Sequence, residues 1–204
     1  LLLTSAGTKF GKTATGTSVW IDAERTSPYQ FYQFWINADD REVGKLLRYF
    51  TLLERDEVES LDRATAEHPE RREAQHALAH DVTGRVHGAE AARVAQEMSS
   101  LLFQKGDPHG LSPAAIGALT KEIPFADVPR GADGTLDVAE LFVAAKLAPS
   151  KGAARRLLDQ GGLTISGRRL AASDRAVQDG DYLAGRYLLL KKGARDYALV
   201  RVAG

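Results

Sequence analysis

The sequence predicts an α+β protein of more than one domain, in which a helical region precedes a smaller region of mixed helices and strands. Two observations lead to this fold class. Apolar residues recur at helical spacing through most of residues 29–122, and strand-like runs bounded by glycine-containing turns gather after residue 160. A chain of 204 residues is long enough to divide into two or three small domains.

The helical region is marked by strong start and stop signals. Ser27 precedes Pro28, and Ser112 precedes Pro113, so in both places a hydroxyl cap is followed by a proline at the first helical position. Gly88 is placed to end a helix. With the apolar spacing, these signals predict helices over residues 28–36, 41–53, 57–67, 69–86 and 89–103, and a short one from residue 113.

The carboxy-terminal region changes character. Residues 136–147 and 151–160 predict two short helices, and the glycines at 161 and 162 suit a sharp exit from the second. Strands are expected at 163–165, 182–191 and 197–202, with a turn at 192–196 between the last two. Because proline and glycine are frequent in residues 124–134, we expect that segment to be a linker.

Composition excludes several classes of protein. The chain is 44% hydrophobic and 26% charged, which is ordinary for a soluble globular protein. No apolar run reaches the roughly 18 residues of a membrane span, so no membrane association is expected. The absence of cysteine excludes disulfides and thiolate metal sites and is consistent with a cytoplasmic location.

The net charge of zero conceals an asymmetry. Residues 146–204 hold 12 Lys+Arg and 5 Asp+Glu, a balance of +7, and the rest of the chain has a balance of −7. A basic end on an acidic body is typical of a nucleic-acid-binding module joined to another domain. Chance unevenness with solvated lysines is the alternative.

Within this basic end, five cations are expected to form one RNA-binding surface. A predicted helix, a glycine turn and the loop that follows would bring them together. Such cations bind phosphates and provide affinity with little choice of sequence. Because no helix-turn-helix recognition surface is evident, the backbone of A-form RNA suits them better than the major groove of DNA. The predicted RNA-binding residues are Lys151, Arg155, Arg156, Arg168 and Arg169.

Three histidines have a spacing that could suit metal ligands. His76, His80 and His87 share one face of the predicted 69–86 helix and its end, but the glutamate of an H-E-x-x-H zinc site is missing. We interpret them as solvated histidines. The pair Asp39 and Asp40 is explained more simply as a helix cap than as a cation site, and no metal site is predicted.

Near the amino end, Lys9 and Lys12 lie in a loop of small hydroxyl residues and glycines that closes with Thr13. Lysine ammonium groups on such a loop suit a polyphosphate, since they are compact charges that can move onto a developing anion. A solvated basic loop is the alternative interpretation.

Three stretches resemble one known family, in the family's own order. K-F-G-K-T at 9–13 resembles the lysine signature loop of class I aminoacyl-tRNA synthetases in the form used by bacterial tyrosyl-tRNA synthetases. T-S-P-Y-Q-F-Y-Q-F-W-I-N-A-D-D at 26–40 resembles the segment that follows this loop, and P-S-K-G-A-A-R-R-L-L-D-Q-G-G-L-T-I-S-G at 149–167 resembles their S-four RNA-binding domain. The family's H-x-G-H signature does not occur in this chain.

The resemblance implies a domain plan. Residues 1–27 would be the carboxy-terminal edge of a Rossmann-type α/β catalytic domain that carries the lysine loop. Residues 28–123 would be an all-α anticodon-binding domain, 124–134 a linker, and 135–204 a small α+β S-four-like RNA-binding domain. Because the nucleotide-binding half of the catalytic domain is missing, this chain is expected to be inactive alone.

The resemblance also implies roles and partners. Lys9, Lys12 and Thr13 match the signature loop, which in the family holds ATP, with Mg²⁺ as its counter-ion, while tyrosyl-adenylate forms. The expected partners are L-tyrosine, ATP and tRNA(Tyr), and the family forms homodimers. Two alternatives are open: a non-enzymatic RNA-binding protein that uses an S-four-like module, and, more remotely, a metal-dependent helical enzyme built around the histidines.

Overall fold

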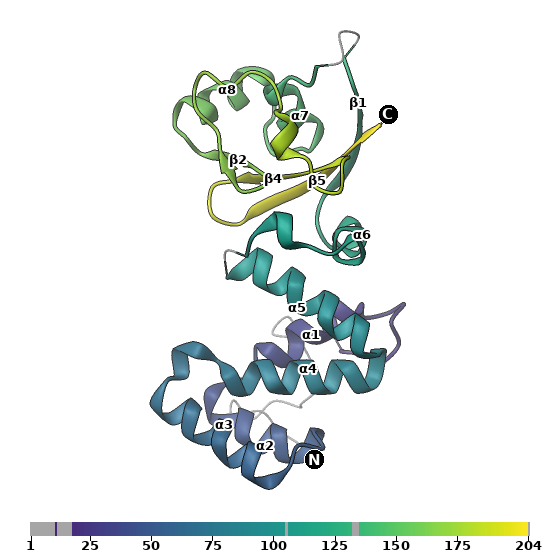
Figure 1. The fold of residues 1–204 in the computed structure, drawn as a ribbon, viewed down its shortest axis with the longest axis vertical. Helices are drawn as coiled ribbons and strands as arrows, with labels where there is room; N and C mark the ends of the chain where they lie inside the picture. The colour runs from purple at the N-terminus through teal and green to yellow at the C-terminus, as the bar shows by residue number, and fades with distance from the viewer. Residues whose placement is uncertain (1–10, 12–17, 105, 132–134, 204) are drawn as a thin grey trace. The chain divides into compact units, whose positions relative to one another are not determined.

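A computed structural model describes residues 11, 18–104, 106–131 and 135–203. The chain divides into two compact units, Leu1–Ser99 and Ser100–Gly204. The first is helical where it is described, and the second contains helices and a mixed sheet (Figure 1). The predicted α+β class is therefore confirmed, whereas the finer division into four segments stays a prediction.

The helical unit follows the predicted order of elements. The polar caps are formed as expected, because the Ser27 hydroxyl accepts a hydrogen bond from the Gln30 backbone N–H at 3.1 Å. Gly88 ends a helix with φ of 93°, a conformation that favours glycine. The helices are α1 (Pro28–Ile36), α2 (Asp40–Phe50), α3 (Arg55–Glu67), α4 (Glu73–His87) and α5 (Ala89–Phe103), which continues past Ser99, and a short 3₁₀ helix, η1 (Pro69–Arg71), precedes α4.

The core of this unit forms around α1, which packs mainly against α4. Phe31, Tyr32 and Trp35 of α1 are buried together with Leu47 of α2 and Leu78 of α4. Burying side chains of this size stabilises the fold by roughly 1.5–3 kcal/mol each. Burial also raises the pKa of Tyr32 to about 12, because the core disfavours the phenolate.

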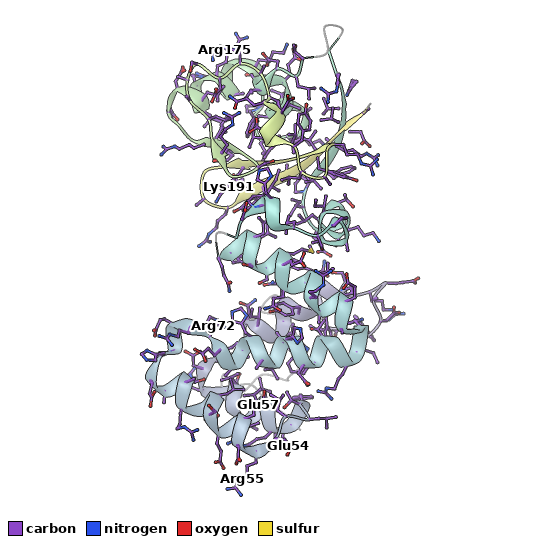
Figure 2. The ribbon with its side chains drawn as sticks, in the orientation of Figure 1. Glu54, Arg55, Glu57, Arg72, Arg175 and Lys191 are labelled. Atoms are coloured by element: carbon purple, nitrogen blue, oxygen red, sulfur yellow. The ribbon has the colours of Figure 1, made fainter. Side chains whose placement is uncertain are left out.

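The continuous helix predicted over residues 69–86 is wrong. Arg72, labelled in Figure 2, has φ of 52°, in the left-handed region, and separates η1 from α4. Local sequence contains no glycine or proline at this position to indicate a break. The break has a tertiary cause, because the arginine side chain reaches the far end of α1.

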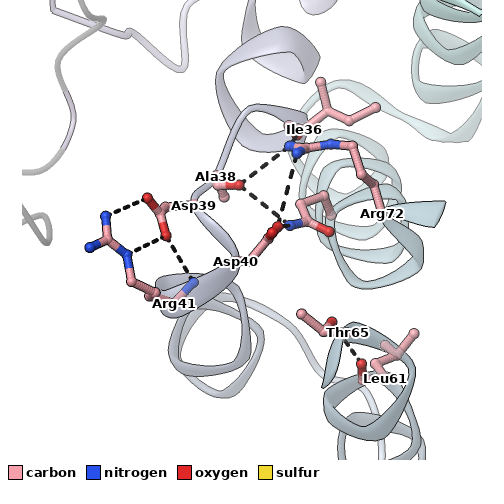
Figure 3. A network of polar contacts seen from close by, with 9 residues as sticks. Ile36, Ala38, Asp39, Asp40, Arg41, Leu61, Thr65 and Arg72 are labelled. Carbon is pink, nitrogen blue, oxygen red and sulfur yellow. Dashed lines mark hydrogen bonds and ion pairs between the residues drawn. The ribbon is translucent and has the colours of Figure 1, made fainter. Parts of the chain in front are cut away.

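Arg72 joins the end of α1 to the start of α2. Its Nη2 donates to the carbonyl oxygens of Ile36 at 2.6 Å and Ala38 at 3.4 Å, and its Nη1 lies 3.9 Å from the Asp40 carboxylate (Figure 3). Gln75 Nε2 donates to the same carboxylate at 2.5 Å. The last carbonyl of α1, that of Ile36, lacks a helical partner and is thus satisfied by a side chain 36 residues away.

The second unit contains a five-stranded sheet with strand order β1-β5-β4-β2-β3. β1 pairs with β5 in parallel, and the other neighbours are antiparallel. The strands are β1 (Phe125–Pro129), β2 (Leu163–Ile165), β3 (Arg168–Arg169), β4 (Tyr187–Lys192) and β5 (Asp196–Ala203). The expected linker at 124–134 thus contains a strand, and the strand expected from residue 182 begins only at Tyr187.

Helices cover one face of this sheet. Figure 1 shows α7 (Val138–Ala144) and α8 (Lys151–Asp159) on the same side of the strands. Leu141 and Phe142 of α7 and Leu158 of α8 are buried in one cluster with alternate residues of the strands. The strand residues in that cluster are Leu163, Ile165, Leu188, Leu190, Ala198, Val200 and Val202. The unit also contains α6 (Pro113–Glu122), whose cap Ser112 accepts from the Ala115 N–H at 3.2 Å, and the short 3₁₀ helices η2 (Pro108–Gly110) and η3 (Asp179–Asp181).

Within the described ranges, no helix combines the length and the apolar character needed to cross a membrane.

We predict that Arg72→Met lowers the free energy of unfolding of the helical unit by about 1.5–3 kcal/mol, because it removes charge-assisted hydrogen bonds to the Ile36 and Ala38 carbonyls. Urea unfolding followed by far-UV circular dichroism measures the change. Arg71→Met, at an exposed neighbouring position, is the matched control. Equal stability of the two variants would contradict the role given to Arg72.

Candidate nucleic-acid interface

The predicted basic helix is α8, and its amphipathic pattern decides where its cations point. Ser150 caps it by accepting from the Ala153 N–H at 3.2 Å. Ala154 and Leu158 are buried in the core of the second unit, whereas Lys151, Arg155 and Arg156 are exposed. Core burial on one side of the helix therefore presents three predicted RNA-binding side chains to solvent.

The three cations differ in what they contact. Lys151 forms an ion pair with Glu140 of α7, and both side chains are about half exposed, at 55% and 54%. A surface pair of this kind holds a lysine only weakly. Arg155 and Arg156 make no side-chain hydrogen bond or ion pair within the part of the chain that the structure describes. Their guanidinium groups are therefore available to phosphate oxygens, which they can bind with two parallel hydrogen bonds.

Arg168, also predicted to bind RNA, is engaged inside the protein. Its Nε and Nη2 donate to the two carboxylate oxygens of Asp181 at 2.7 Å each, and its Nη1 donates to Asp174 at 3.0 Å. Asp181 is only 2% exposed. Burial by itself raises the pKa of Asp181, but hydrogen bonds from Arg168 and from the Gln178 N–H outweigh it and hold this pKa below its usual value. Arg168 thus anchors the segment 171–181, and its role in RNA binding stays a prediction.

Arg169 lies at the edge of the helix exit. It is exposed, and its Nε donates to the Gly161 carbonyl oxygen at 3.0 Å. A Cβ at Gly161 would come within 2.8 Å of Arg169 Nη2, and Gly161 itself has φ of 65°. The turn after α8 therefore needs glycine both for its backbone conformation and for the approach of Arg169. This contact places Arg169 next to the exit of the basic helix, and its role in RNA binding stays a prediction.

The structure adds cations that the sequence pattern had assigned only to a strand and a turn. Lys191 and Lys192, at the end of β4, pair with Thr164 and Leu163 of β2 (Lys191 is labelled in Figure 2). The Gly193 N–H donates to the Gly162 carbonyl at 2.9 Å, so the β4–β5 turn, which also carries exposed Arg195, touches the exit of α8. In the sequence these cations are visible as two lysines and an arginine around Gly193, a pattern that could have indicated a basic turn. Only the strand register shows where they lie.

Two of the three histidines, His76 and His87, contact aromatic side chains of α1. His80 is exposed, as predicted, but the solvated interpretation is wrong for His76 and His87, which are half-buried. The Tyr32 hydroxyl lies 3.5 Å from His76 Nδ1, and the His87 ring meets the Phe31 ring edge-on at 4.9 Å. Burial, aided by the charge of Arg72, lowers the pKa of His76, and burial lowers that of His87.

Asp39 has the capping role that the sequence predicted, whereas Asp40 is the first residue of α2. The Asp39 carboxylate accepts from the Arg41 N–H at 2.9 Å at the start of α2, and hydrogen bonds from the Arg41 side chain hold the pKa of Asp39 below its usual value. Asp40 accepts from Gln75, as described above. Among the described residues, no group of three or more potential metal-ligating side chains lies together. The lysine loop with Lys9, Lys12 and Thr13 lies outside the described residues.

Two family models match the chain. One, described as tRNA synthetases class I (W and Y), matches residues 1–104, which is half of the chain, and the other, described as the tyrosine–tRNA ligase SYY-like C-terminal domain, matches residues 116–200. The chain therefore belongs to the class I tRNA synthetases of the tryptophan and tyrosine group. The second match and the relatives below confirm its likeness to the carboxy-terminal part of bacterial tyrosyl-tRNA synthetases.

Several curated relatives align over nearly all of this chain. A tyrosine–tRNA ligase from Anaeromyxobacter dehalogenans is 47% identical over 202 residues, which are 99% of this chain and 48% of the relative. Those from Nocardia farcinica and Geobacillus stearothermophilus are both 44% identical, cover 97% and 99% of this chain, and match 47% of their own length. The chain thus spans about half the length of the curated relatives it matches.

We predict that Arg168→Gln lowers the free energy of unfolding of the second unit by about 2–5 kcal/mol at neutral pH, because it leaves the carboxylate of Asp181 buried without its cation. Urea unfolding measures this, with Arg169→Gln as the exposed control. Since Asp181 has a lowered pKa in the folded state, the pair stabilises fully above the unfolded pKa of about 3.9, and this stabilisation is lost as the pH falls through the folded pKa.

The gap between wild type and Arg168→Gln should therefore narrow as the pH is lowered below about 4. A gap that stays constant from neutral to acidic pH would show that Arg168 stabilises the unit by packing alone.

Proposed function

We propose that this chain is the tRNA-binding part of a tyrosine–tRNA ligase and that the exposed face of α8 grips the phosphate backbone of tRNA(Tyr). The observation that supports this most directly is the pair Arg155 and Arg156, exposed and without a partner in the described structure, on a helix within the matched C-terminal-domain region. Lys151, Arg169 and the β4–β5 turn extend the same basic surface.

The complete enzyme would catalyse two steps. ATP, with Mg²⁺ as its counter-ion, would activate L-tyrosine to tyrosyl-adenylate with release of pyrophosphate, and the tyrosyl group would then pass to tRNA(Tyr). In this proposal Lys12 and Lys9 bind the triphosphate and stabilise the charge that develops on the leaving pyrophosphate, and Thr13 closes the loop.

In this proposal different parts of the chain contact different regions of the tRNA. Residues 1–27 would border the catalytic site, residues 28–123 would face the anticodon region, and residues 135–204 would hold the variable arm or the anticodon stem. The complete enzyme would act as a homodimer, as the family does. Support for this plan comes from the order of the two family matches along the chain.

A non-enzymatic RNA-binding protein is the weaker alternative. It would account for the basic surface, but it would not explain why residues 1–104 match the synthetase model or why the curated relatives are ligases over the whole chain. The lysine loop and the segment 26–40 also have no reason to occur together in such a protein.

We predict that the double variant Arg155→Gln with Arg156→Gln weakens binding of chain 1–204 to tRNA(Tyr) by tenfold or more at low ionic strength. Each lost phosphate contact should also reduce the slope of log affinity against log salt by about 1. Fluorescence anisotropy with a labelled transcript measures both quantities.

The matched control for this variant is Lys121→Gln with Arg186→Gln, which removes two exposed charges elsewhere in the same unit. If both double variants weaken binding equally, net charge and not the α8 surface explains the affinity.

In the complete enzyme, Lys12→Ala should slow tyrosyl-adenylate formation by a factor of 10² or more while tyrosine affinity changes little, because the lysine would contact the triphosphate and not tyrosine, and most strongly as charge develops on the leaving pyrophosphate. Rapid-quench measurement of pyrophosphate release separates the two effects. Adenylate formation at the wild-type rate would refute the role given to Lys12.

A further inference from the structure

The sheet of the second unit has a second face, on which a row of polar and aromatic side chains crosses four strands. Arg169 of β3 is paired with Thr164 of β2, Thr164 with Lys191 of β4, and Lys191 with Tyr197 of β5. Their chain neighbours Leu163, Ile165, Leu190 and Ala198 are buried in the core beneath α7 and α8. Because side chains alternate between the faces of a sheet, the row lies on the face away from those helices.

Two members of this row form a cation–aromatic pair. Lys191 Nζ lies 4.9 Å from the centroid of the Tyr197 ring. Both side chains are half-buried, as is Thr164, and Arg169 is exposed. The pair therefore places an aromatic ring and an ammonium group together at the surface. Proteins bind nucleotides with this combination, because a base can stack on the ring while the ammonium group contacts a phosphate.

The row adjoins the basic helix at one end. Arg169 donates to Gly161, and Gly193, in the turn that joins β4 to β5, donates to Gly162. Both glycines form the exit of α8, which carries Arg155 and Arg156. A strand of RNA bound to the helix could thus continue onto the row without leaving the surface of the unit.

We propose that this row, Arg169, Thr164, Lys191 and Tyr197, binds an unpaired nucleotide of the RNA whose backbone α8 holds. A base stacks on Tyr197, Lys191 and Arg169 contact the flanking phosphates, and the Thr164 hydroxyl contacts a phosphate or a ribose 2′-hydroxyl. An unpaired base is required because the bases of an A-form duplex are already stacked and cannot open onto an aromatic ring. The inference rests on the proposed function of α8 and adds to it a preference for single-stranded RNA.

The alternative is a purely structural role, in which Lys191 and Tyr197 only stabilise the hairpin of β4 and β5. Cross-strand pairs of this kind stabilise a sheet by up to about 1 kcal/mol. That role predicts no difference between single-stranded and duplex RNA, so the two explanations separate in a binding experiment.

The experiment uses chain 1–204 and two RNA hairpins with the same stem. One is blunt, and the other carries a 3′ overhang of about six nucleotides with 2-aminopurine in it. Binding is measured by anisotropy of a 5′ fluorophore, and stacking by quenching of 2-aminopurine. Tyr197→Leu removes the ring, Tyr197→Phe keeps it, and circular dichroism checks that each variant is folded.

We expect Tyr197→Leu to weaken binding of the overhang hairpin by about fivefold or more and to abolish quenching, whereas binding of the blunt hairpin changes by less than about twofold. Tyr197→Phe should behave as wild type, and Lys191→Gln should weaken binding of the overhang hairpin. Equal losses on both hairpins, no loss on either, or no quenching with wild type would overturn the inference.

The proposed function is tested separately by Arg155→Gln with Arg156→Gln on the blunt hairpin. A loss there with no effect of Tyr197→Leu would leave α8 as an RNA-binding helix and remove the nucleotide site. Failure of the wild-type chain to bind either hairpin would overturn both proposals.

Discussion

The second unit depends on the burial of one face of its sheet beneath α7 and α8. That face takes every second residue of β2, β4 and β5, so the residues between them must point the other way. The same constraint turns Ala154 and Leu158 of α8 inward and leaves Arg155 and Arg156 in solvent. The basic surface and the row that ends at Tyr197 are both consequences of where the apolar side chains are buried.

Charge alone does not tell which arginines are free to bind a partner. Arg155, Arg156, Arg168 and Arg169 look alike in the sequence, yet Arg168 is held by two carboxylates while Arg155 and Arg156 have no partner in the described structure. The difference comes from Asp174 and Asp181. Both lie in the segment that follows β3, and the fold brings this segment back against Arg168. A buried carboxylate is stable only with a cation beside it. Arg168 provides this cation for Asp181, so its guanidinium group is already paired within the protein.

Local patterns predicted the elements that local physics forms. Ser27 with Pro28 and Ser112 with Pro113 predicted the correct helix starts, and Gly88 marked the end of α4 to within one residue, because capping involves neighbouring residues only. The sequence predicts a linker where β1 lies, because the stability of this strand comes from parallel pairing with β5, some 74 residues away at Asp127 and Arg201. Arg72 breaks a predicted helix for the same kind of reason, since its partners are at the end of α1. Elements that depend on contacts between distant segments cannot be predicted from a local window of sequence.

By itself, the sequence determined the order of the elements, the basic character of the carboxy-terminal region and, through three motifs, the family to which the chain belongs. Those properties reside in residue types and their spacing. Tertiary structure alone decided which cations face solvent, which one is neutralised by Asp181, and that Lys191 and Tyr197 stand beside Thr164 and Arg169. Strand register and burial set these outcomes, and both arise only when segments far apart in the chain pack together.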